Sequence, residues 1–308
     1  HIFVPAKMNN TFFKMDSVAL VGKHKSVNYI YPFKYSSALQ NVDSIERFHW
    51  NVYCLSGIVG QGNGLSTTED LFKFDQILYS GKLLKSSTLE EAFTPTKLTS
   101  GDYANADINL GKASYGLGWF IFDDITNGKI VWHTGGVPGA LSILLRNINK
   151  KQTVIILDNT FSSGIYKNGV NALNILNNQP IVKTKQSLTR IYGSTLVDKG
   201  IDSAFFKFQQ LKDDTVYYFL NEDDMIRLGG ELLEDKSLKG NNNLELALEV
   251  FKLNIILFPN SSNAYSWYAY AMAQVGRKEE AVWLYQKSLK IKPDDEVKSY
   301  LEELLKSK

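Results

Sequence analysis

The fold is decided by a stretch of β-branched and aromatic residues that glycines interrupt, GKIVWHTGGVPGALSILL at residues 128–145. Such runs predict strands, and the glycine-rich breaks within and before them are typical of turns. Similar runs lie on both sides, so the region predicts an antiparallel meander of three to four strands. The expected strands are Ser114–Asp123, Lys129–His133, Ala140–Ile148 and Thr153–Leu157.

Helices are expected before and after this meander. Two capping boxes, in which Ser is followed by Glu three residues later, indicate helix starts. The first, at Ser66, predicts a helix over Leu65–Gly81, whose final glycine suits a C-terminal cap. The second, at Ser87, predicts a shorter helix that ends before Pro95. A third helix, over Ser163–Leu176, would cover one face of the sheet.

After Pro180 the composition is helical, and no strong strand pattern returns. Three pairs of residues lie 34 positions apart: Ala247 and Ala281, Phe251 and Tyr285, Pro259 and Pro293. This period resembles the tetratricopeptide repeat, in which Ala lies where two helices touch, an aromatic ring fills the groove and Pro stops the second helix. The best-formed repeat covers Ser262–Asp295, and Leu188–Leu211 predicts a degenerate helix pair.

Length and charge narrow the class of protein. A chain of 308 residues is about twice the size of a typical domain, so we expect two domains, at residues 1–180 and 185–308. Since 34 basic and 32 acidic residues leave a net charge of +2, no strong field attracts nucleic acid. No apolar run is long enough to cross a bilayer.

The chain offers little for disulfide or metal chemistry. Cys54 is the single cysteine, which excludes an intrachain disulfide. His1, His24 and His49 are scattered without the spacing of metal ligands. We therefore expect no metal and no cofactor.

Several landmarks follow one another in a fixed order. IFVPAKMNNT at residues 2–11 precedes GLSTTEDL at residues 64–71, and YGLGW at residues 115–119 precedes HTGGVPG at residues 133–139. Over residues 1–160 this order resembles the class C-like branch of the serine β-lactamase, penicillin-binding protein and esterase superfamily. Bacterial members of that branch can carry a helical, repeat-like C-terminal extension.

The resemblance implies a fold and a location. The expected fold is an α/β (α+β) serine β-lactamase/transpeptidase-like domain with an antiparallel sheet, incomplete at its amino terminus. An all-α domain with tetratricopeptide-like repeats would follow it. Family relatives act outside the cytoplasm, which implies a periplasmic or other extracytoplasmic location.

The resemblance also implies roles for the third active-site motif. In the family, a serine activated by a lysine and a tyrosine attacks an acyl carbonyl, and the third motif lines the strand beside them. His133 would take the place usually held by lysine, and Thr134 would hydrogen-bond a carboxylate or carbonyl of the substrate. Gly135 and Gly136 would let substrate approach the strand, and the Gly136 N–H would be one of two oxyanion-hole donors.

Substrate contacts are implied for the rim of the cleft as well. Gln61, Gly62 and Asn63 lie where the family has its cleft-rim loop. The substrate would be a small molecule or a peptide with an amide, peptide or ester bond. A histidine in the third motif fits β-lactams, D-amino-acid peptides and simple esters alike.

The family's nucleophile is missing from this sequence. No Ser-x-x-Lys occurs in it. Tyr103-Ala104-Asn105 spells Tyr-x-Asn, but it lies only 28 residues before His133 in a polar stretch that predicts an exposed loop, so we interpret it as a coincidence. We expect the C-terminal portion of a serine hydrolase with little activity by itself. Two alternatives are a non-catalytic protein that binds a protein partner through its repeats, and a site completed by a separate chain.

Overall fold

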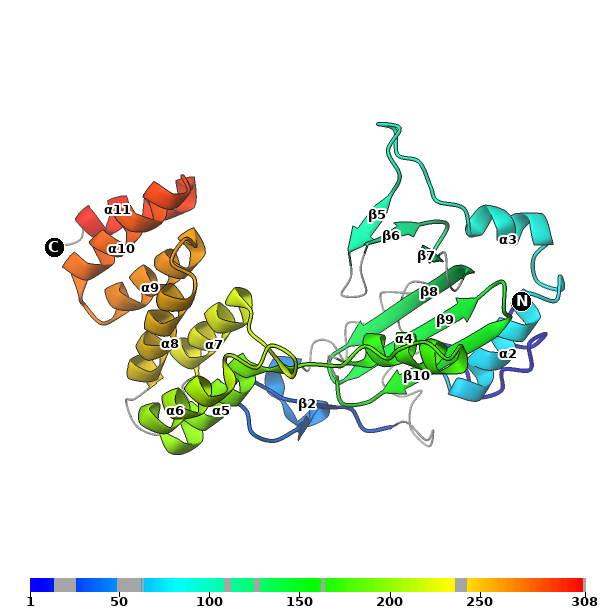
Figure 1. The fold of residues 1–308 in the computed structure, drawn as a ribbon, viewed down its shortest axis with the longest axis horizontal. Helices are drawn as coiled ribbons and strands as arrows, with labels where there is room; N and C mark the ends of the chain where they lie inside the picture. The colour runs from blue at the N-terminus through cyan, green and yellow to red at the C-terminus, as the bar shows by residue number, and fades with distance from the viewer. Residues whose placement is uncertain are drawn as a thin grey trace. The chain divides into compact units, whose positions relative to one another are not determined.

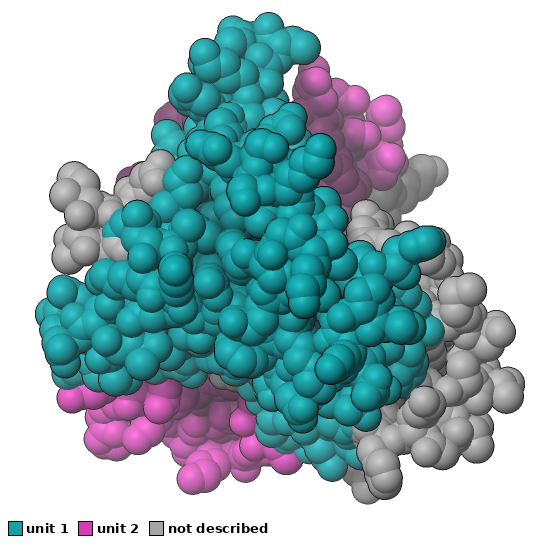
Figure 2. All heavy atoms as spheres, turned by 90° about the vertical axis from the view of Figure 1, so that its right-hand side faces the viewer, with its two compact units in different colours: residues 1–30, 39–184 teal, residues 31–38, 185–308 magenta. Residues whose placement is uncertain are grey.

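The computed structural model describes residues 1–13, 26–48, 62, 64–107, 112–124, 128–161, 164–235 and 243–306. The chain divides into two compact units, coloured separately in Figure 2. The first unit comprises His1–Ile30 and Leu39–Thr184, and the second comprises Tyr31–Ala38 and Lys185–Lys308. The segment Tyr31–Ala38, which the sequence predicts as part of the first domain, belongs to the second unit.

The described part of the first unit contains a six-stranded antiparallel sheet in which each strand pairs with its neighbours in sequence (Figure 1). The predicted meander is confirmed; its first predicted strand is divided into two, and one further strand lies at that edge of the sheet. The strands are β5 (Asn105–Asp107), β6 (Lys112–Tyr115), β7 (Phe120–Asp124), β8 (Gly128–Val137), β9 (Ala140–Asn147) and β10 (Gln152–Asp158).

The prediction of a single strand over Ser114–Asp123 is wrong, because the chain turns between β6 and β7. Gly118 has a φ of +78°, a conformation that favours glycine. At Gly116 a Cβ atom would lie 2.2 Å from the Ala92 carbonyl oxygen, so only glycine fits there. The YGLGW landmark is therefore the last residue of β6, Tyr115, followed by the turn that leads into β7.

Strand β8 is longer than predicted. It runs through Gly135 and Gly136 to Val137, and Pro138-Gly139 alone forms the turn to β9. Gly139 has a φ of +75°, which the tight turn requires. The third motif thus lies inside a paired strand, whereas the predicted strand ended at His133, the first residue of the motif.

Helices cover both faces of the sheet. On one face, α4 (Ile165–Leu176) packs against β9 and β10, as predicted (Figure 1). On the opposite face lie α2 (Thr68–Leu78) and α3 (Ser86–Ala92). Because side chains alternate along a strand, Trp132 joins the α4 cluster and Val131 joins the cluster of α2 and α3.

The caps of α2 and α3 differ from the predicted capping boxes. The N-cap of α2 is Thr67, whose hydroxyl accepts from the Asp70 N–H, and the Ser66 hydroxyl instead lies 2.8 Å from that of Thr11. Helix α3 has Lys85 at its N-cap without a side-chain hydrogen bond. Helix α2 ends at Leu78, before Gly81 rather than at it.

Asp70 joins two of the sequence landmarks. Its fully buried carboxylate accepts from the Asn10 N–H at 2.7 Å, from the Thr11 hydroxyl at 2.9 Å and from the Lys73 ammonium at 3.0 Å. Burial acts to raise the pKa of Asp70, but these donors stabilise the charged form and hold the pKa below its ordinary value. The segment IFVPAKMNNT is thereby fastened to the start of α2.

The second unit is built from helices that pack in consecutive pairs. They are α5 (Leu188–Lys199), α6 (Ile201–Leu211), α7 (Glu222–Glu234), α8 (Asn243–Leu257), α9 (Ser262–Gln274), α10 (Lys278–Ile291) and α11 (Asp295–Lys306). The helix pair expected over Leu188–Leu211 is present. Two short parallel strands, β11 (Gln186–Ser187) and β12 (Tyr218–Phe219), were not predicted.

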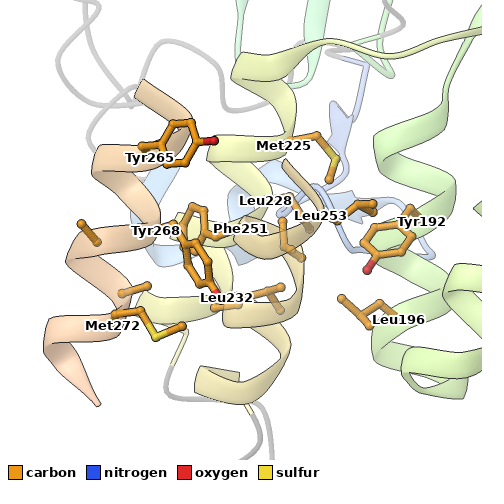
Figure 3. Packing of buried hydrophobic residues seen from close by; sticks show 14 of the residues in the cluster. Tyr192, Leu196, Met225, Leu228, Leu232, Phe251, Leu253, Tyr265, Tyr268 and Met272 are labelled. Atoms are coloured by element: carbon orange, nitrogen blue, oxygen red, sulfur yellow. The ribbon is translucent and has the colours of Figure 1, made fainter. Parts of the chain in front are cut away.

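One apolar cluster runs through the second unit, and Figure 3 shows part of it. Ala247 and Ala281 are fully buried, and the rings of Phe251 and Tyr285 are buried beside them. At Gly229 a Cβ atom would lie 2.5 Å from Phe251 Cζ, so glycine lets α7 approach α8. The alanines and aromatic residues of the 34-residue period are therefore core residues of the second unit.

The aromatic residues of α9 and α10 divide into two groups. Tyr265, Tyr268 and Tyr285 are buried, whereas Trp267, Tyr270 and Trp283 are exposed. The first group contributes to the core, and the second lies on the surface. No helix of the described part has both the length and the apolar character that crossing a bilayer requires.

Candidate active site

The third motif, His133-Thr134-Gly135-Gly136, lies on the half of β8 that pairs with β9 alone. Strand β7 pairs with β8 from Gly128 to Trp132 and no further. Strand β9 continues the pairing to the turn: His133 opposite Leu144, Thr134 opposite Ile143, Gly135 opposite Ser142 and Gly136 opposite Leu141. Among the described residues, no strand pairs with the other edge of β8 beyond Trp132.

The register decides which backbone groups face this open edge. The Lys129 carbonyl accepts from the Ile148 N–H at 2.9 Å, so Lys129 directs its backbone groups toward β9. In an antiparallel strand the N–H and C=O of one residue point to the same side, and successive residues alternate. The N–H and C=O of Thr134 and Gly136 therefore point to the open edge.

The ring of His133 is held between two oxygen atoms. Its Nδ1 lies 2.7 Å from the Thr134 carbonyl oxygen, and its Nε2 lies 3.4 Å from the Tyr115 hydroxyl. Because a carbonyl can only accept, Nδ1 carries the proton, and in the neutral ring Nε2 is then an acceptor. The exposed imidazole also lies against Phe120, with ring centroids 5.5 Å apart.

The side chain of Thr134 points to the face of the sheet opposite to the one that carries His133. Its hydroxyl forms a hydrogen bond with Tyr166 of α4. Burial raises the pKa of Tyr166, and this hydrogen bond opposes the shift. The Thr134 side chain thus faces α4, while its backbone groups face the open edge.

The two glycines of the motif have different surroundings. At Gly135 a Cβ atom would lie 2.6 Å from Ser142 Oγ, so the partner strand requires glycine at this position. At Gly136 the nearest atom would be the end of the Leu141 side chain at 3.2 Å, and the residue is exposed. Gly136 therefore leaves its own N–H accessible.

The cleft-rim residues are only partly described. Gln61 and Asn63 lie outside the described residues, as do His24, His49 and Cys54. Gly62 is a half-buried residue in a single bridge. Their contact with substrate stays a prediction.

The Tyr-x-Asn sequence lies in paired backbone, where an exposed loop was predicted. Tyr103 bridges Lys97, and Asn105 begins β5 opposite Ser114. The Tyr103 side chain is exposed and lies beneath the Lys97 ammonium, 5.5 Å from the ring centroid. These contacts account for Tyr103 without a catalytic role.

Two tyrosines at the motif escaped sequence analysis. Tyr115 lies within the YGLGW landmark, so a conspicuous pattern contained it, although the pattern did not indicate its contact with His133. Tyr166 has no local pattern that distinguishes it, because its contact with Thr134 depends on how α4 crosses the sheet. The described residues contain no group of three or more His, Cys, Asp or Glu that could hold a metal ion.

Comparisons with known proteins agree with this fold. The beta-lactamase family model matches residues 1–173. Penicillin-binding protein 4* of Bacillus subtilis (strain 168) is 30% identical over 231 residues, which are 74% of this chain and 48% of that protein. This chain is therefore a member of the beta-lactamase family, whose fold is that of serine hydrolases, and it spans about half the length of this relative.

Two solved structures are also similar. The octameric penicillin-binding protein homologue from Pyrococcus abyssi is 24% identical, with 59% of this chain and 37% of that chain covered and a TM-score of 0.45. The penicillin-binding protein from Bacillus halodurans is 20% identical, with 57% and 47% covered and a TM-score of 0.42. The family match ends before residue 185, so the tetratricopeptide-like character of the second unit stays a prediction.

Proposed function

We propose that the open edge of β8 is one wall of the acyl-binding slot of a serine hydrolase, which forms an acyl-enzyme on an amide, peptide or ester. The observation that carries this proposal is the orientation of the Thr134 and Gly136 backbone groups toward an edge that no described strand covers. The membership of the beta-lactamase family supports it.

Each residue of the motif has a chemical role in this proposal. When a serine attacks the acyl carbonyl, the negative oxygen accepts from the Gly136 N–H, a type of contact that contributes about 3 to 4 kcal/mol per donor. His133 lies beside the slot, and its Nε2 accepts a proton or a hydrogen bond while the Thr134 carbonyl holds Nδ1. The Thr134 N–H is a second backbone donor toward substrate.

Residues 1–308 contain no Ser-x-x-Lys, and so we propose that they form no acyl-enzyme by themselves. A fluorescent penicillin and a fluorophosphonate, applied to this 308-residue chain, test this directly. We expect no covalent label. A label on this chain would mean that another residue is the nucleophile.

A second experiment tests the wall itself in a gene product that carries Ser-x-x-Lys upstream. Gly136→Pro removes the proposed oxyanion donor without breaking the ladder to β9, since this N–H points away from β9. We expect acylation to slow by about 100-fold or more. Gly136→Ala keeps the N–H and is the matched control, and equal rates for the two variants would refute the assignment.

The alternative is a non-catalytic protein that binds a protein partner through the helical unit. The exposed rings of Trp267, Tyr270 and Trp283 favour it, because aromatic residues are enriched at interfaces. The coding sequence upstream of His1 separates the two proposals. Ser-x-x-Lys and Tyr-x-Asn there would support the hydrolase, and a reading frame that starts near Met8 would support the binding protein.

A further inference from the structure

The segment Tyr31–Ala38, which we call the tip, is held in the second unit by acidic groups of α7. The Lys34 ammonium pairs with Asp224 at 2.5 Å, with both side chains about four-fifths buried. The Lys34 backbone N–H donates to Glu231. One residue of the tip is therefore bound through its side chain and its backbone at once.

The tip also enters the apolar core of the second unit. The ring of Tyr35 is buried, and its hydroxyl donates to Asp235. The Phe33 ring stacks on it with centroids 4.9 Å apart, and Arg190 donates to the Phe33 carbonyl at 3.4 Å. Gly193 of α5 allows this approach, because a Cβ atom there would lie 3.3 Å from the Tyr35 Cα.

The tip closes a hairpin whose stem belongs to the first unit. Strands β2 (Tyr29–Ile30) and β3 (Gln40–Asn41) form this stem, with two residue pairs. Isolated two-stranded hairpins are at best marginally stable. A stem this short depends on contacts outside its own ladder.

The stem packs against the end of β8. At Gly139, in the turn between β8 and β9, a Cβ atom would lie 2.3 Å from Val42 Cγ2 and 2.8 Å from Asn28 Cβ. The Val42 N–H donates to the Asn28 carbonyl at 2.9 Å, and the Tyr29 N–H donates to Asn159 beyond β10 at 2.7 Å. The stem thus supports the Pro138-Gly139 turn, which begins two residues after Gly136.

We propose that the hairpin Asn28–Val42 is a positioning element for strand β8, anchored at its tip by the helical unit and in contact at its stem with the Pro138-Gly139 turn. Val42 and Lys34 are its positioning residues. The functional meaning rests on the proposed function, since the strand it supports carries the candidate oxyanion donor. The mechanical link between tip and turn is independent of that function.

Hydrogen exchange of the intact 308-residue chain, followed by mass spectrometry, tests the link. Lys34→Ala weakens the anchor of the tip, and we expect roughly 5- to 30-fold faster exchange in peptides that cover residues 133–145. Arg277→Ala, which removes the exposed Arg277–Glu280 ion pair of the same unit, is the control and leaves these peptides unchanged.

Two further variants keep the proposal open to refutation if Lys34→Ala does not fold. Tyr35→Phe removes only the hydroxyl that binds Asp235, and Val42→Ala loosens the stem at the turn while leaving the tip in place. Each is expected to accelerate exchange at residues 133–145. Unchanged exchange there in all folded variants, whether or not the tip itself loosens, overturns the proposal. Because exchange requires no nucleophile, this result is separate from a failure of acyl-enzyme labelling.

Discussion

The two units are stabilised in different ways. In the second unit, a single apolar cluster extends from α5 to α10, and its buried polar residues, Thr189, Asn254 and Ser288, are uncharged. In the described part of the first unit, the core is divided into three smaller clusters, and three charged residues, Asp70, Asp75 and Arg146, are buried. The helical unit depends on many similar contacts, and the sheet unit depends on a few specific polar ones.

The largest effect is expected at the ion pair of the first unit. Arg146 of β9 lies 2.6 Å from the Asp75 carboxylate of α2, and the Thr153 hydroxyl donates to the same carboxylate at 2.8 Å. Arg146→Ala would leave the Asp75 charge buried without its partner, at a cost of about 3 to 5 kcal/mol in the free energy of unfolding. Urea unfolding measures the loss. Hydrogen exchange in α9, which belongs to the second unit, is the internal reference and should not change.

A double variant sharpens this result. Asp75→Leu together with Arg146→Met replaces both charges by apolar groups and is expected to recover most of the stability. A cost below about 1 kcal/mol for Arg146→Ala alone would show that the pair is not a specific anchor of the sheet unit.

A smaller effect is expected where α7 packs on α8. Gly229→Ala forces a methyl group against Phe251 and should cost about 1 to 3 kcal/mol. Gly230→Ala, one residue further on the same helix, meets no atom within 4 Å and should stabilise the helix by about 0.5 to 1 kcal/mol. Thermal unfolding of both variants measures the difference, and effects of the same sign would contradict close packing at Gly229.

The smallest effect is expected at Asp70 and depends on pH. Asp70→Asn keeps an oxygen for Asn10 and Thr11 but loses the charge that Lys73 binds, so it should cost about 1 kcal/mol at pH 7. Because folding lowers the pKa of Asp70, its contribution is complete above the ordinary value of 3.8 and is lost as the pH falls through the folded pKa. The free energies of unfolding of the wild type and the variant, measured with urea, should therefore converge toward low pH. A difference between them that grows as the pH falls would mean that folding raises the pKa of Asp70.

Local sequence predicted the elements of the sheet better than their ends. Alternation and turn glycines identified the strands, but whether Gly116 turns and Gly135 stays extended depends on Ala92 and Ser142, which lie elsewhere in the chain. The cap of α2 is a similar case, because Ser66 and Thr67 are both good N-cap residues. The choice between them follows from Thr11, 55 positions away.

The candidate site shows the same limit. The motif located His133, Thr134, Gly135 and Gly136, but the backbone groups that face the open edge follow from the register with β9 and from the point where β7 stops pairing. The assignment of the tip to the helical unit was also beyond local sequence. Nothing in Tyr-Pro-Phe-Lys-Tyr indicates the carboxylates of α7 that bind it.

The position of the tip in the sequence also matters for how the chain folds while it is being synthesised. Lys34 and Asp224, which pair in the folded chain, are 190 residues apart. At a synthesis rate of about 5 to 20 residues per second, the tip leaves the ribosome on the order of 10 to 40 s before its partner helix exists. During this interval its aromatic residues have no native core to enter, so the nascent chain carries an exposed apolar segment that chaperones can recognise.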